Sequence, residues 1–133
     1  MGDQLHQKRR LTLALTILGT KVSFPTRQLE SFPAPQGISG VKFHTDEFTS
    51  LCPVTGQPDF CSVTIEYIPG ALCLESKSLK LYLWSFRERG AFTEAIACEI
   101  ADDIVAAISP QSLTVTVFQQ PRGGISLEAK SSR

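Results

Sequence analysis

The chain has 133 residues, enough for one compact domain and few for two, so we expect a single domain over residues 1–133. Hydrophobic residues make up 42% and charged residues 20%, a composition that excludes an intrinsically disordered chain. The 13 basic and 13 acidic side chains give a formal net charge of zero, which argues against a general nucleic-acid binder with surplus lysine and arginine.

The N-terminal part is predicted to be loose and polar over residues 1–10 and to form a strand over residues 11–24. Its basic start and apolar core are similar to a signal peptide. Thr12 and Thr16 interrupt that core, however, and Lys21 stands where a small-residue cleavage site should be. Every apolar run is far shorter than the ~20 residues that cross a bilayer. We therefore expect a cytoplasmic protein without a membrane span.

Prolines and glycines divide the middle of the chain. Residues 32–37 are predicted to be a turn-rich connection, because proline and glycine interrupt regular structure. Apolar and polar residues alternate over residues 41–46, which predicts a half-buried strand. A polar loop with two prolines and a glycine is expected over residues 48–60. A further strand is predicted over residues 61–67, ended by the Pro-Gly pair that follows.

Two neighbouring helices are predicted in the second half. Residues 76–87 contain no glycine or proline, and their apolar side chains have helical spacing. Residues 92–108 carry phenylalanine or isoleucine at every fourth position and should form a helix that ends before Pro110.

The C-terminal part is predicted to contain a strand over residues 113–117, a turn over residues 121–124 and a short strand over residues 125–127. Helices that are grouped together, rather than alternating with strands, indicate an α+β fold with a mostly antiparallel sheet and both helices on one face. An open sheet this small has exposed edges, so we expect the chain to associate with copies of itself.

Four cysteines are spread through the chain, and no two have the C-x-x-C spacing of a metal or redox motif. The histidines, His6 and His44, do not stand at ligand spacing from a cysteine, so we expect no zinc or other metal site. Three of the four cysteines are expected to be small buried hydrophobic residues. A functional role for the fourth depends on its neighbours.

The loop around Cys52 carries the clearest chemical pattern. Its cysteine is followed by proline, threonine and glycine, and Asp59 comes seven residues later, where a strand begins. A loop that folds back could place a thiolate and a carboxylic acid around one point, as addition to a C≡N or C=O group requires. A structural loop with a buried thiol and a turn-capping aspartate fits the same spacing, and the spacing alone favours it.

Two further segments could bind an anion. Serines begin the helix predicted after Glu75 and could cap it, and the N–H groups of a helix start attract anions. Lys77 and Lys80 share one helical face and could meet a phosphate together, or they could form an ordinary solvated edge. Arg122 offers a guanidinium beside two glycines, which would allow a ligand to approach the backbone closely. An ordinary tight turn would have the same sequence. Glu94 is most simply a partner of the helix dipole.

Taken together, the loop Cys-Pro-Val-Thr-Gly-Gln-Pro-Asp, the run Glu-Ser-Lys-Ser-Leu-Lys-Leu-Tyr and the turn Pro-Arg-Gly-Gly-Ile closely resemble a known family. They are similar to the short, single-module NADPH-dependent 7-cyano-7-deazaguanine reductases, the nitrile reductases of queuosine biosynthesis. The resemblance runs from about Leu15 to Ser126. It implies the tunnelling fold shared with GTP cyclohydrolase I, in which subunit sheets join into a barrel and active sites lie between the subunits of a homo-oligomer.

The resemblance also implies roles for individual residues. Cys52 corresponds to the nucleophile that forms a covalent thioimide with the nitrile carbon, and Asp59 to the proton donor for the nitrile nitrogen. Glu94 corresponds to the carboxylate that holds the guanine-like edge of 7-cyano-7-deazaguanine. The implied substrate-binding stretch is Leu74, Glu75 and Ser76. The implied NADPH contacts are Ser76, Lys77, Lys80, Arg122 and Gly123.

One substrate-binding position departs from the family pattern. The family has a Phe-His-Glu run, and here Thr93 stands between Phe92 and Glu94 in place of the histidine. A threonine cannot act as an imidazole acid or base, nor cover the substrate with a ring. Because Asp59 already corresponds to an acid, we expect the reaction to persist at a lower rate.

Three other functions are consistent with parts of the pattern. A related archaeal enzyme forms an amidine on tRNA through the same thioimide, but it lacks the Glu-Ser-Lys-Ser run, and the zero net charge also speaks against it. A zinc-dependent GTP cyclohydrolase would need a Cys/His ligand set that the sequence lacks. A non-catalytic deazapurine-binding protein is favoured only by the missing histidine.

Overall fold

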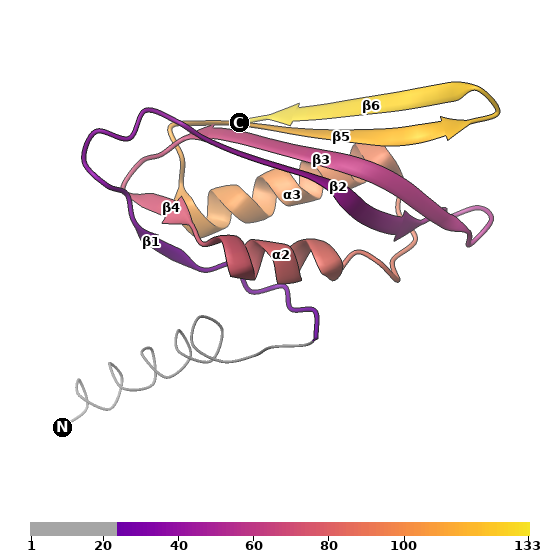
Figure 1. Cartoon of the computed structure of the whole chain (residues 1–133), viewed down its shortest axis with the longest axis horizontal. Helices are drawn as coiled ribbons and strands as arrows, with labels where there is room; N and C mark the ends of the chain where they lie inside the picture. Colours follow the sequence, from indigo (N-terminus) through magenta and orange to yellow (C-terminus); the bar gives the residue numbers. More distant parts are fainter. Residues whose placement is uncertain (1–23) are drawn as a thin grey trace.

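The computed structural model describes residues 24–133 (Figure 1). The predicted loose segment, and all but Phe24 of the predicted strand over residues 11–24, lie outside the described residues; Phe24 is in no strand. Within residues 24–133, no helix is long and apolar enough to cross a membrane.

The main sheet has four antiparallel strands in the order β2-β3-β5-β6. Two helices, α2 and α3, lie on one of its faces (Figure 1), and β1 and β4 form a separate antiparallel pair. The predicted α+β fold with two adjacent helices is therefore confirmed. The bounds of the strands are β1 Ser31–Pro33, β2 Val41–Leu51, β3 Pro58–Ile68, β4 Leu72–Leu74, β5 Ser112–Arg122 and β6 Ile125–Ser132. The helices are α2 Ser76–Trp84 and α3 Thr93–Ile108.

The core lies between the sheet and α3. Strand β3 buries alternate residues, as a strand with one covered face must. Helix α3 presents a row of isoleucines at four-residue spacing to this face, which confirms its predicted periodicity. It ends at Ser109, whose backbone is left-handed with a φ of 44°, just before Pro110. The fully buried α3 isoleucines are Ile96, Ile100, Ile104 and Ile108.

The predicted loop over residues 48–60 is wrong in its extent. Ser50 pairs with Asp59 and Leu51 with Pro58, so β2 and β3 continue and only residues 52–57 connect them. Ser50 and Asp59 are buried although polar, and Pro58 is tolerated because it opens its strand. The polar residues at the end of β2 and the start of β3 therefore led the sequence analysis to predict a loop where the two strands continue.

Other boundaries also differ from the predictions. Helix α2 stops at Trp84 instead of residue 87, because the N–H groups of Phe86 and Arg87 bond three residues back and tighten the chain into turns. Strands β5 and β6 are much longer than the segments predicted over 113–117 and 125–127, and they leave a two-residue turn at Gly123 and Gly124. Both glycines have positive φ, at 57° and 79°. Strands β1 and β4 were not predicted, since three residues carry no period.

Truncation of Ile100 tests the packing of α3 on the sheet. Its side chain is fully buried, so Ile100→Ala should lower the free energy of unfolding by about 2–5 kcal/mol in urea denaturation. Ile68, which is 45% exposed on β3, gives a matched control, and Ile68→Ala should cost about 1 kcal/mol or less. Equal losses in the two variants would contradict this location of the core.

Candidate active site

The loop that carries Cys52 is closed by its own backbone. The N–H of Cys52 donates to the carbonyl of Gln57 at 2.8 Å, and the N–H of Gly56 donates to the carbonyl of Cys52 at 2.8 Å. Gly56 has a φ of 73°, a conformation that glycine adopts without strain. These bonds hold a half-buried thiol at the end of the sheet where β2 ends and β3 begins.

The segment before α3 is attached to the same end of the sheet. Leu51 donates its N–H to the carbonyl of Arg89 at 2.8 Å and accepts from the N–H of Ala91 at 3.2 Å. Gly90 lies against Pro53, since a Cβ at Gly90 would be 3.5 Å from the Pro53 Cα. The start of α3 is thereby held beside the cysteine loop.

Thr93 and Glu94 differ in their surroundings at the start of α3. Thr93 is buried, and its hydroxyl donates to the Oε1 of Gln119 at 2.7 Å. Gln119 pairs with Cys61 across β3 and β5, so the threonine is tied to the sheet. Glu94 is exposed in the first turn of the helix, where a carboxylate is favoured by the helix dipole.

Asp59 is buried beneath a cation from the neighbouring strand. Its Oδ1 forms an ion pair with the guanidinium of Arg122, which also donates to the carbonyl of Pro58 at 3.0 Å. The same arginine hydrogen-bonds Cys52 and contributes to lowering the pKa of its thiol. Arg122 therefore connects the two residues that the sequence pairs as nucleophile and acid.

The thiol of Cys52 is activated by its own loop. Its pKa is lowered to about 7, first by the side chain of Thr55, then by the backbone N–H groups of Thr55 and Val54, with Arg122 adding a smaller part. The contrast with Cys61 is clear, because burial and the nearby Asp59 carboxylate raise that pKa to about 11. Cys52 thus combines partial access with a thiolate near neutral pH, as a nucleophile requires.

The residues around the start of α2 form a second group, whose cap differs from the prediction. Glu75, not a serine, caps the helix: its carboxylate accepts from the N–H groups of Lys77 and Ser78, both at 2.7 Å. Ser78 is instead buried, donating to the Glu75 carbonyl and accepting from the Glu30 N–H, both at 2.9 Å. The first-turn amides bound by Glu75 are therefore not open to an outside anion. Leu74, just before Glu75, is buried.

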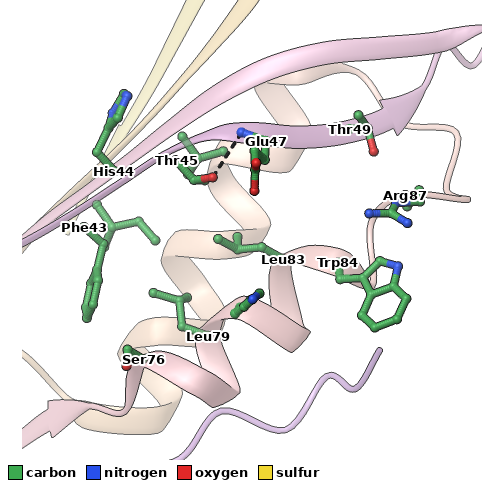
Figure 2. A pocket seen from close by; sticks show the side chains of 13 residues that line it. Phe43, His44, Thr45, Glu47, Thr49, Ser76, Leu79, Leu83, Trp84 and Arg87 are labelled. Atoms are coloured by element: carbon green, nitrogen blue, oxygen red, sulfur yellow. Dashed lines mark hydrogen bonds between the residues drawn. The ribbon is translucent and has the colours of Figure 1, made fainter. Parts of the chain in front are cut away.

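A cavity of about 590 Å³ opens between α2 and β2 (Figure 2). Ser76 and Lys80 line it together with Trp84 and Arg87 of the helix and its end. Neither Cys52 nor Asp59 is among its lining residues. The cavity combines two cationic side chains with an indole ring, and the Arg87 guanidinium lies 5.3 Å from that ring's centroid.

The structure thus sorts the predicted site residues into two groups, one where β2 ends and one at β4 and the first half of α2 (Figure 1). One group lies at the cysteine loop and the β5–β6 turn: Cys52, Asp59, Thr93, Glu94, Arg122 and Gly123. The other lies at β4 and α2: Leu74, Glu75, Ser76, Lys77 and Lys80. Thr55 was not predicted, and its only signal is a hydroxyl three residues after the cysteine. The described residues contain no cluster of three potential metal ligands.

Alkylation of Cys52 tests the activation of its thiol. The rate of reaction with iodoacetamide, followed by peptide mass spectrometry, should rise through a midpoint near the pKa of about 7. Thr55→Val removes the largest cause of the lowered pKa, so its midpoint should move upward toward that of an unperturbed thiol. Exposed Cys98 serves as the internal control in both proteins. An unchanged midpoint would show that the Thr55 hydroxyl does not stabilise the thiolate.

Comparison with known proteins identifies the family of this chain. The family model described as QueF-like protein matches residues 58–133, more than half of the chain. A protein of Frankia casuarinae is 49% identical over 120 residues, covering 90% of this chain and 96% of its own. One of Syntrophus aciditrophicus is 50% identical over 119 residues, covering 88% and 84%. Both are named NADPH-dependent 7-cyano-7-deazaguanine reductase.

Among solved structures, an archaeosine synthase described as QueF-Like, in its apo form, is similar with a TM-score of 0.69. It is 28% identical, and the match covers 73% of this chain and 95% of that one. The identity is well below the 49% and 50% shared with the two reductases. The chain belongs to the QueF family, on the branch of the NADPH-dependent 7-cyano-7-deazaguanine reductases.

Proposed function

We propose that this chain reduces the nitrile of 7-cyano-7-deazaguanine to an aminomethyl group, through a thioimide on Cys52, as a step of queuosine biosynthesis. The observation that carries the proposal is the low-pKa Cys52 thiol, which shares Arg122 with the buried Asp59. Addition of a thiolate to a nitrile needs a nucleophile and a nearby acid, and these side chains supply both. The 49% identity to a named reductase over 90% of the chain supports the same reaction.

Cys52, Asp59 and Glu94 each have a separate role in the proposed reaction. The Cys52 thiolate attacks the nitrile carbon, and Asp59 gives a proton to the nitrogen, which leaves a neutral C(=NH)–S thioimide. NADPH would supply one hydride in each of two successive reductions, so that two NADPH and two protons convert one nitrile to the amine. The first reduction breaks the C–S bond and returns the Cys52 thiolate. Glu94 accepts N–H groups of the guanine-like ring and orients the substrate.

The cavity between α2 and β2 fits a phosphorylated dinucleotide. Lys80 and Arg87 bring cationic side chains that suit phosphates, and Trp84 offers an aromatic face for a base. Ser76 adds a hydroxyl at the start of the helix. These residues would hold the cofactor mainly by side chains, because Glu75 already occupies amides at the start of α2.

We infer that the two groups of site residues meet across a boundary between copies of the chain. Within one chain, one group lies where β2 ends and the other at β4 and the first half of α2 (Figure 1). The cysteine end also exposes large apolar side chains, including Val54, Phe92 and Ile125. A patch of this kind is typical of an interface. β2 and β6 are the outer strands of the described sheet and can pair with another copy.

The cysteines suit a reducing compartment. Cys52, Cys61, Cys73 and Cys98 are all free thiols. Thiols persist in the cytoplasm, whereas secreted proteins form disulfides. We therefore place this NADPH-dependent chemistry in the cytoplasm.

Cysteine variants test the covalent step. Mixing the protein with 7-cyano-7-deazaguanine without NADPH should add the mass of the nitrile to the peptide that contains Cys52. Cys52→Ala should lose both the adduct and the nitrile-dependent oxidation of NADPH, whereas Cys98→Ala, at an exposed position on α3, should keep both. An adduct that survives in Cys52→Ala would refute the assignment. An adduct without NADPH oxidation would favour the amidine-forming alternative or a non-catalytic binder.

Mixed oligomers test the shared site. Cys52→Ala and Lys80→Ala affect different groups, so each variant alone should be impaired, and co-expression of the two should restore part of the NADPH oxidation. Mixed assemblies contain some sites with an intact Cys52 from one copy and an intact Lys80 from the other. Co-expression of Cys52→Ala with Asp59→Asn, both in the same group, is the matched control and should restore nothing. Equal recovery in the two mixtures, or none in either, would contradict a site between copies.

A further inference from the structure

A polar side chain continues the buried row of β5 at the cysteine end of the sheet. Residues two apart on a strand lie on the same face, so Gln119 follows Val115 and Val117, which are fully buried in the core. Gln119 pairs with the buried Cys61 of β3, which places both on the face that the helices cover. Gln119 itself is only half-buried, so part of its amide is open to a ligand.

The Thr93 hydroxyl fixes the orientation of the Gln119 amide. It donates to the Gln119 Oε1 at 2.7 Å, and Thr93 is only 4% exposed. A buried hydroxyl needs one such acceptor, and that need is met by the oxygen alone. Because the amide is planar, its two N–H groups lie on the other side, and within residues 24–133 no second hydrogen-bond partner holds them. Gln119 therefore presents donors to the space beside it.

These donors lie between the two ends of the proposed substrate site. Along β3, Asp59 is two residues from Cys61, the pairing partner of Gln119. Along α3, Glu94 directly follows Thr93, the residue bonded to Gln119. The proposed reaction places the nitrile at Asp59 and the N–H edge of the ring at Glu94. Gln119 is thus attached to the elements that carry both.

The proposed substrate has a hydrogen-bond acceptor at the corresponding place. Along the rim of 7-cyano-7-deazaguanine, the ring carbonyl stands between a ring N–H group and the carbon that bears the nitrile. A ring that is joined to Cys52 through its nitrile carbon, and whose N–H groups meet Glu94, turns its carbonyl to the region between them. An amide N–H suits that oxygen, and the amide stays uncharged at any working pH.

We propose that Gln119 donates a hydrogen bond to the ring carbonyl of the substrate, and that Thr93 is a positioning residue that holds the Gln119 oxygen. The inference rests on the proposed function. A ring with an amino group in place of the carbonyl would present N–H groups to N–H groups, and a half-buried donor would lose its partner. A site built on a hydrogen bond discriminates more strongly than one built on size. Gln119 therefore selects the oxo ring against its amino counterpart.

The test is a change of ring preference, measured by titration calorimetry with ligands that carry no nitrile. 7-Deazaguanine has the ring carbonyl, and 2,6-diamino-7-deazapurine has an amino group in its place. Gln119→Glu keeps an acceptor for Thr93 but replaces the N–H donors with an oxygen that is ionised at about pH 8. It should weaken binding of 7-deazaguanine by about tenfold and shift the preference toward the diamino ring by about tenfold or more. Equal changes in the affinity for both rings would overturn the proposal.

The matched control is the same substitution at the next residue. Gln120 is exposed, so Gln120→Glu adds the same charge outside the buried row and should leave the ring preference unchanged. If Gln119→Glu does not fold, Gln119→Asn gives a second measurement without a new charge. Its amide is one methylene shorter, so the preference for 7-deazaguanine should fall by about threefold to tenfold. A preference that is fully retained in Gln119→Asn would overturn the proposal.

Two further variants test the role of Thr93. Thr93→Val removes the hydroxyl that holds the Gln119 oxygen, so the preference for 7-deazaguanine should fall. Thr93→Ser keeps a hydroxyl at the same position and should restore the preference. The same ring preference in both variants would overturn the positioning role of Thr93.

Failure of the two proposals can be told apart. A Cys52 adduct and nitrile-dependent NADPH oxidation in the natural protein, together with an unchanged ring preference in Gln119→Glu, would overturn only the contact with the carbonyl. Absence of the adduct, of the oxidation and of 7-deazaguanine binding in the natural protein would overturn the proposed function, and this inference with it.

Discussion

The candidate site depends on two backbone hydrogen bonds made by Leu51. Through them the last residue of β2 binds Arg89 and Ala91, so the start of α3 is joined to the end of the sheet. The Arg89 side chain strengthens this junction, because it pairs with Glu99 at 3.0 Å and lies 4.9 Å from the centroid of the Phe86 ring. This junction adds a backbone link between the cysteine loop and α3 to the packing of α3 on the sheet.

The same region shows how far the sequence predicts the fold. The periodic helix α3 was predicted to within one residue at its start, because its burial pattern follows its hydrophobic pattern. The ends of β2 and β3 were missed for the opposite reason. Ser50 and Asp59 are buried although they are polar. A prediction from hydrophobic alternation therefore places a loop at these positions. The sequence signal for the fold therefore fails where polar groups are buried at the candidate site.

The site itself was predicted in part. Cys52 and Asp59 were paired from their spacing and their similarity to a family, and the structure connects both to Arg122. That link could not be predicted from the sequence, because it depends on the register that brings the end of β5 beside the start of β3. The Thr55 hydroxyl was missed for a similar reason, since a threonine in a turn is usually only a turn former.

The cap of α2 has a consequence for ligand recognition. The Glu75 carboxylate accepts hydrogen bonds from the amides at the start of α2, where an anion would otherwise bind. Because Glu75 is part of the chain, it competes with a free anion at any concentration of protein. An incoming phosphate must then be recognised by long, mobile cationic side chains rather than by rigid backbone amides. Recognition of this kind weakens as ionic strength rises, and single substitutions readily retune it. The preference among phosphorylated dinucleotides can therefore drift in evolution while the fold of the helix is left intact.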